Sequence, residues 1–126
     1  MSSSVRDRYV TDSVTTASPA RLVTMMYDAL VRDLVIAEQA AGTRDFAIMN
    51  ERLLHAQDIL IELGAALDVK AWDGGPALAH IYSFLIRELI AANVSKDGEK
   101  VQTCRHLIEP LQQAWHEAAK QLGAAQ

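Results

Sequence analysis

Apolar residues recur at intervals of three and four along four successive segments of this chain, which is the spacing of one face of an α-helix. The first segment also has a well-marked start. Ser18 can accept a hydrogen bond from a free N–H of the first helical turn, and Pro19 supplies a preset φ where no N–H is needed. The pattern predicts an all-α fold.

The periodic positions define the expected core. In the first segment they are Leu22, Met25, Met26, Ala29, Leu30 and Leu34. In the second they are Phe46, Met49, Leu53, Ala56, Leu60, Leu63 and Leu67. In the third they are Leu78, Ile81 or Tyr82, Leu85, Leu89 and Ala92. In the fourth they are Val101, Cys104, Leu107 or Ile108, Leu111, Trp115 and Leu122.

Short breaks rich in Gly, Pro and Asp separate these segments. The breaks contain Gly42, Asp73-Gly74-Gly75-Pro76 and Ser95-Lys96-Asp97-Gly98. The expected helices run from Pro19 to about Ala41, from a cap at Asp45 to about Leu67, from the Pro76 region to about Val94, and from a cap at Asp97 onward. Because short loops make sequential helices antiparallel, we expect an up-down four-helix bundle.

Pro110 departs from the helical pattern of the fourth segment. Inside a helix, proline removes the hydrogen bond to the carbonyl of His106 and clashes with it, at a cost of about 3 kcal/mol if unrelieved. The last helix is therefore expected either to kink near His106 or to consist of two helices that meet there.

Length and composition suit one intracellular domain. A chain of 126 residues can bury roughly two-thirds of its unfolded surface in one core. Residues 1–17, rich in Ser, Thr and charges, are expected to form a flexible arm, and residues 18–126 the bundle domain. The net charge is −4 with scattered Lys and Arg, so no basic stripe points to nucleic acid.

Cysteine content and hydropathy favour the cytoplasm. The single Cys104 excludes an internal disulfide and suits a reducing compartment. The N-terminus lacks the apolar core of a signal peptide. No apolar run approaches the roughly 18 residues needed to span a bilayer, so membrane insertion is not expected.

The sequence contains no evident catalytic or cofactor site. A di-iron bundle needs Glu-x-x-His motifs, and none of the four histidines has Glu three residues before it. Glu51 with His55, and Gln112 with His116, lie one turn apart, but a single such pair is far more often an exposed polar pair than a metal site. Cys104 is interpreted as a small core residue. We expect no enzyme activity, no metal and no cofactor.

The second and third segments carry more apolar residues than one core stripe needs. The additional positions are Ala47, Ile48, Leu54, Ile59, Ile61, Ala65, Ile86 and Ile90. A wide core face would account for about half of them. The alternative is an exposed groove that receives amphipathic helices from a partner. The residues alone leave both interpretations open.

Several motifs resemble those of a known family. The pattern T-A-S-P-x-x-L-V-x-M-x-Y-D-x-x-L, from Thr16 to Leu30, resembles the opening of the FliS family of flagellar secretion chaperones. The other matching motifs are Ala56 to Leu63, Leu67-Asp68, Asp73-Gly74-Gly75, Tyr82, Arg87, Leu89, Ala92-Asn93, Asp97 and Ala114-Trp115. Their order and spacing extend the resemblance over nearly the whole chain.

This resemblance implies a cytosolic type III export chaperone. Such a protein binds the disordered C-terminal segment of flagellin, prevents premature polymerisation and helps to deliver flagellin to the export gate. The expected partner-binding residues are Tyr9, Ile48, Leu54, Ile61, Ala65, Ile86 and Ile90. The alternative is a helical structural or regulatory protein that uses its surplus apolar face for homodimerisation or another partner. We expect a monomer or a weak dimer.

The chain departs from the family pattern in two places, at Arg6 and at the pair Arg87-Glu88. Tyr9 lies near the spacing of an N-terminal family tyrosine that can fold back onto the bundle or take part in gate recognition. A second tyrosine is often found three residues earlier, where this chain has Arg6. Arg87 and Glu88 replace a usual pair of basic residues, so no acidic partner is inferred for that position.

Overall fold

Four long helices make up almost all of the structure, a computed structural model that describes residues 19–68, 70 and 73–125. The helices are α2 (Pro19–Gly42), α3 (Phe46–Ala66), α4 (Gly75–Ser95) and α5 (Gly98–Ala125). The described residues form no strand. The predicted arm and Tyr9 lie outside the described residues.

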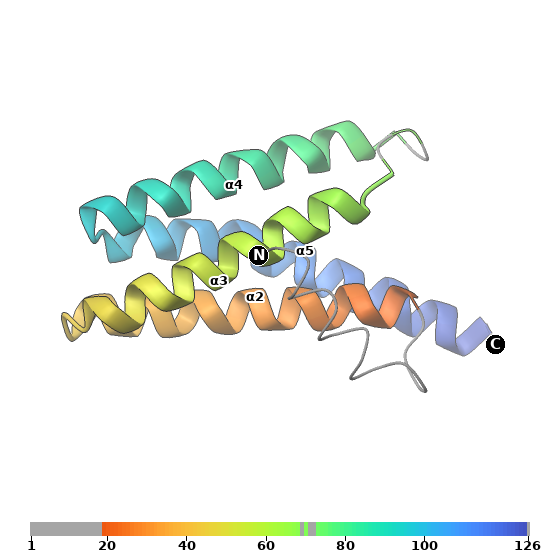
Figure 1. Ribbon diagram of the computed structural model, residues 1–126. Coiled ribbons are helices and arrows are strands. Elements are labelled where there is room, and N and C mark those ends of the chain that lie inside the picture. The colour runs from red at the N-terminus through yellow and green to blue at the C-terminus, as the bar shows by residue number, and fades with distance from the viewer. Residues whose placement is uncertain (1–18, 69, 71–72, 126) are drawn as a thin grey trace.

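The helices form the predicted antiparallel bundle (Figure 1). Helix α2 packs against α3 and α5, and α4 packs against the same two helices from the other side. Helices α2 and α4 are therefore diagonal to each other, as are α3 and α5. The all-α up-down prediction is confirmed.

Capping side chains start two helices where the sequence predicted. The Oδ1 of Asp45 accepts a hydrogen bond from the N–H of Ile48 at 3.3 Å, at the start of α3. The Oδ1 of Asp97 accepts one from the N–H of Lys100 at 3.2 Å, at the start of α5. These bonds satisfy backbone donors that have no partner within the helix. Helix α4 ends at Ser95, and the capping residue Lys96 has a φ of 56°, which lies in the left-handed region.

Helix α5 is continuous through Pro110, so the two-helix alternative is wrong. Both Pro110 and His106 are exposed. The carbonyl that loses its helical hydrogen bond therefore belongs to an exposed residue, where water can solvate it, and this reduces the cost of the proline.

The core contains most of the predicted positions. It also shows which residue is buried at the two positions where the sequence left a choice. Its fully or nearly fully buried members include Tyr27, Leu30, Leu34, Met49, Leu53, Leu60, Tyr82, Leu85, Leu89, Val101, Cys104 and Ile108. Tyr82 and Ile108 are buried, whereas Ile81 is partly buried and Leu107 is exposed. The assignment of Leu122 to the core was wrong, because its side chain is 55% exposed. The C-terminal part of α5 projects beyond the other three helices, so none of them covers it (Figure 1).

Carboxylates on α2 bind side chains on both neighbouring helices. Asp33, only 2% exposed, accepts a hydrogen bond from Arg52 of α3 at 3.3 Å and pairs closely with His55 of the same helix. On the other side, the Oδ1 of Asp28 lies 2.9 Å from Nε2 of Gln112 and 2.7 Å from Nε2 of His116. Both histidines, which the sequence suggested were exposed polar residues, thus join helices.

Helix α4 is the most apolar helix and is poorly covered. An 18-residue stretch of it has a mean hydropathy of 1.2, yet only 28% of that stretch is buried. By length and composition α4 could cross a membrane, contrary to the expectation from sequence. One such helix is weak evidence for a membrane span, because helices of ordinary bundles pass the same test. In this fold, α4 packs against α3 and α5.

One buried contact joins the diagonal helices α2 and α4. The hydroxyl oxygens of Tyr27 and Tyr82 lie 2.6 Å apart, and both side chains are buried. Burial raises the pKa of both phenols, so both stay neutral at physiological pH and one can donate to the other.

We predict that the two hydroxyls are energetically coupled. Tyr82→Phe should lower the free energy of unfolding by about 1–2 kcal/mol, because it leaves the Tyr27 hydroxyl buried without its partner. The double variant with Tyr27→Phe should cost clearly less than the sum of the two single variants. Urea unfolding of all four proteins measures this coupling, and additive costs would contradict it.

A second prediction concerns the buried thiol. Burial, with a smaller effect of the Glu88 carboxylate, raises the pKa of Cys104 from 9.0 to about 11. At pH 8.5 the native thiol should resist a thiol reagent that rapidly labels the urea-unfolded chain. Between pH 9 and 11 the unfolded chain loses this proton first, so stability should fall with rising pH. A Cys104→Ala variant should lack this component of the decline.

Candidate functional site

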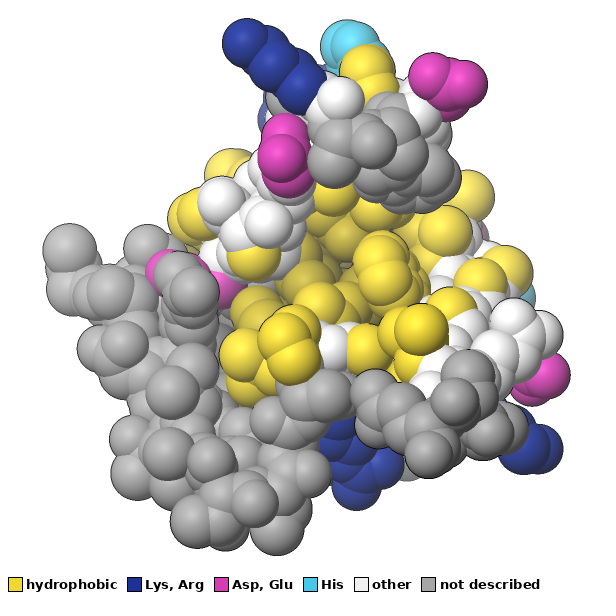
Figure 2. All heavy atoms as spheres, turned by 90° about the vertical axis from the view of Figure 1, so that its right-hand side faces the viewer, with side chains coloured by type: hydrophobic (Ala, Val, Ile, Leu, Met, Phe, Trp, Pro, Cys, Tyr) yellow, Lys and Arg dark blue, Asp and Glu magenta, His cyan; other side chains and the backbone are white. Residues whose placement is uncertain are grey.

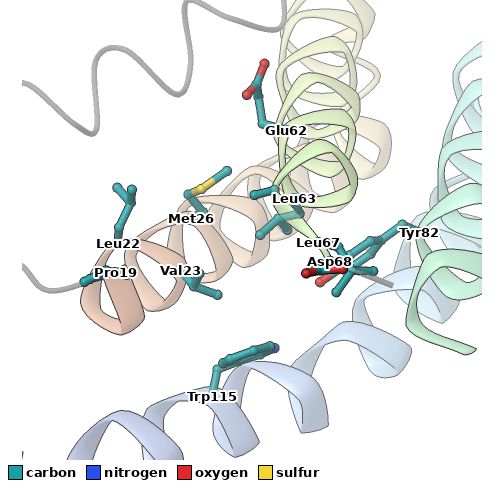
Figure 3. Close-up of a pocket in the computed structure, with 11 residues that line it drawn as sticks. Pro19, Leu22, Val23, Met26, Glu62, Leu63, Leu67, Asp68, Tyr82 and Trp115 are labelled. Atoms are coloured by element: carbon teal, nitrogen blue, oxygen red, sulfur yellow. The ribbon is translucent and has the colours of Figure 1, made fainter. Parts of the chain in front are cut away.

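An apolar pocket opens at the end of the bundle where α2 begins and α3 ends (Figure 2). Its volume is about 400 Å³. The residues that line it are Pro19, Leu22, Val23, Met26, Glu62, Leu63, Ala66, Leu67, Asp68, Tyr82 and Trp115 (Figure 3). We call this cavity the end pocket. All four helices contribute to it, so it depends on the assembled bundle.

Aromatic side chains form the inner wall of the end pocket. Trp115 of α5 lies with its ring centroid 6.3 Å from that of Tyr27, at a tilt of 35°. Tyr82, the partner of the Tyr27 hydroxyl, also lines the pocket. Trp115 was expected to plug the core near one bundle end. It lies at such an end, but it is only partly buried and leaves an open cavity beside it.

Two carboxylates lie at the edge of this apolar cavity. Asp68 is exposed, and its Oδ1 accepts a hydrogen bond from the N–H of Lys70 at 3.1 Å. Glu62 is only 6% exposed and projects from α3 on the far side of the pocket from Trp115 (Figure 3). The pocket thus combines mostly apolar walls with two carboxylates.

A second apolar surface flanks the contact between α3 and α4. The Nδ2 of Asn93 donates a hydrogen bond to Oδ1 of Asn50 at 2.8 Å, which places these sides of the two helices next to each other. At helical spacing, the row through Asn50 continues to Leu54 and Ile61. The row through Asn93 continues back to Ile90 and Ile86. We call Leu54, Ile61, Ile86 and Ile90 the α3–α4 face.

The α3–α4 face is accessible. Leu54, Ile61 and Ile90 are exposed, and Ile86 is partly buried against the core. Ala65, also exposed, extends the α3 row by one turn. Five of the seven predicted partner-binding residues therefore lie along one side of the bundle.

Ile48 lies elsewhere on α3. It is exposed, but it shares a side of the helix with His55, which pairs with Asp33 of α2. Ile48 therefore lies toward α2 and away from the α3–α4 face. Ile59, another surplus apolar residue, is fully buried and belongs to the core.

Sequence reasoning missed the end pocket. Leu22, Met26 and Leu67 were assigned to core stripes, and nothing in their spacing shows that the helices leave a cavity between them. One signal was present in the sequence: Glu62 interrupts the apolar run I-L-I-E-L, and its side chain is only 6% exposed.

The chemistry of both surfaces suits binding. Among residues 19–68, 70 and 73–125, no group of three or more His, Cys, Asp or Glu side chains could hold a metal ion. Apolar walls with a few polar groups at the edge are typical of sites that bind an amphipathic segment.

Comparison with known proteins identifies the family. The family described as "Flagellar protein FliS" matches residues 1–122. A protein of Bacillus subtilis (strain 168) named "Flagellar secretion chaperone FliS" is 28% identical over 110 residues, covering 87% of this chain and 82% of that protein. Proteins of the same name from Salmonella typhimurium and Vibrio cholerae are 31% and 27% identical, each over 84% of this chain and 80% and 79% of their own length.

The family match spans nearly the whole chain, and it agrees with the helical bundle and with the motifs between Thr16 and Trp115. Flagellar chaperones are not an enzyme class. The chain belongs to the FliS family of flagellar secretion chaperones.

Proposed function

We propose that this protein is a cytosolic export chaperone that binds the disordered C-terminal segment of flagellin. By covering that segment it prevents premature polymerisation, and it helps to deliver flagellin to the gate of the flagellar type III export apparatus. The observation that carries the proposal is the pairing of an open apolar pocket with an exposed apolar face on one small bundle.

The two surfaces suit a segment that folds as it binds. An amphipathic helix needs an apolar groove for residues spaced by three and four, and the α3–α4 face offers apolar residues at that spacing. The end pocket can hold one larger apolar side chain as an anchor. Because ordering the segment costs free energy, the complex can be specific and still releasable.

The mechanism is stoichiometric masking. While the flagellin segment covers the apolar surfaces of the chaperone, its own apolar residues cannot pair with other flagellin subunits. Release then requires competition at the export gate.

The first test is calorimetric titration of the full chain with the C-terminal segment of flagellin from the same organism. We expect one-to-one binding with a clearly negative heat-capacity change, because apolar surface becomes buried. Absence of binding would contradict the proposal. A tight dimer in light scattering with no binding would favour the alternative, a structural protein that pairs through its apolar face.

Substitution on the α3–α4 face gives a sharper prediction. Ile61, 43% exposed, can be changed to Asp with little effect on helicity, because the carboxylate remains in water. If the flagellin segment covers this side chain, Ile61→Asp should weaken binding at least about ten-fold, since a charge would be buried at the contact.

Leu107→Asp is the matched control. Leu107 is 45% exposed in the middle of α5, which does not contact α3. It should leave affinity nearly unchanged, with circular dichroism confirming that both variants fold. Equal weakening by the two variants would argue against a specific role of the α3–α4 face.

A further inference from the structure

Glu62 is a buried carboxylate whose charge is unmatched by any described neighbour. It is 6% exposed, and within residues 19–68, 70 and 73–125 it forms no hydrogen bond and no ion pair. A buried charge without a partner is costly, and natural proteins usually supply one. By contrast Asp33, on the facing side of α2, is also buried but has both Arg52 and His55.

The surroundings of Glu62 explain why no neighbour neutralises it. It lines the end pocket, and the other lining residues include Leu22, Met26 and Ala66. None of these side chains can donate a hydrogen bond. Because Glu62 lines an open pocket, a group that enters the pocket can approach its carboxylate.

We propose that Glu62 recognises a Lys or Arg side chain of the bound flagellin segment, next to the apolar residue that fills the end pocket. This inference rests on the proposed function and specifies the chemistry of its ligand. The segment must present a basic residue beside an apolar anchor, and a segment with apolar residues alone would leave Glu62 buried and unpaired.

A long basic side chain fits this place for two reasons. Its methylene groups can lie along Leu22 and Met26, while its charged end reaches the carboxylate. The exposed carboxylate of Asp68 also lines the pocket and adds negative potential that attracts a cation. The end pocket would then fix the register of the segment, whereas the α3–α4 face supplies apolar contact.

The test compares Glu62→Gln with the wild-type chain in titrations with the flagellin segment at two salt concentrations. Gln keeps the size of Glu and removes its charge. We expect Glu62→Gln to weaken binding about ten-fold or more and to reduce its salt dependence. Glu51→Gln, an exposed position on the same helix outside the pocket, should bind like the wild type.

Segments in which each Lys or Arg is changed singly to Gln then identify the partner. One of these changes should weaken binding to the wild type and have little further effect on Glu62→Gln, since both remove the same ion pair. Additive effects for every basic residue would overturn the proposal.

Failure of this inference is distinct from failure of the proposed function. Unchanged affinity of Glu62→Gln, with normal binding by the wild type, overturns only the role of Glu62. If Glu62→Gln instead shifts the melting temperature of the free chain and leaves affinity unchanged, the cation partner lies within this chain, and the proposal is also wrong. No binding by the wild type would contradict the proposed function itself.

Discussion

The buried hydroxyl pair of Tyr27 and Tyr82 is the polar contact at the centre of this bundle. It joins the diagonal helices α2 and α4, whose backbones do not approach each other closely within the described residues. Two tyrosines are long enough to meet across the centre, and each satisfies the polar atom of the other. The end pocket lies beside this pair, and Tyr82 forms part of its wall.

Helices α2 and α4 are linked to their neighbours by different kinds of contact. Helix α2 is fixed by buried or partly buried carboxylates, through Asp33 to α3 and through Asp28 to α5. Helix α4 has weaker polar links, such as Asn93 to Asn50 and the partly exposed Lys100–Glu88 pair. The apolar side chains of α4 are correspondingly less covered. In the proposed function, α2 with its many polar links would maintain the fold, while the poorly covered α4 would contact the partner.

A charged residue at an apolar pocket can favour one orientation of a bound segment. A purely apolar pocket would accept many sequences, since apolar contacts carry little information about orientation. In the proposed complex, Glu62, which lines the end pocket, would favour one orientation of the bound segment over its reverse. The same physical rule explains Asp33, which has its partners within the chain and therefore stabilises the helix register.

The sequence by itself determined the four helices, their caps at Asp45 and Asp97, most of the core and the family. These follow from local spacing and capping chemistry, which do not depend on distant residues. Only the tertiary structure decided between Tyr82 and Ile81, placed Leu122 outside the core, and revealed the end pocket. Helical periodicity fixes which residues share a face, but burial depends on where neighbouring helices end and how far apart their side chains hold them.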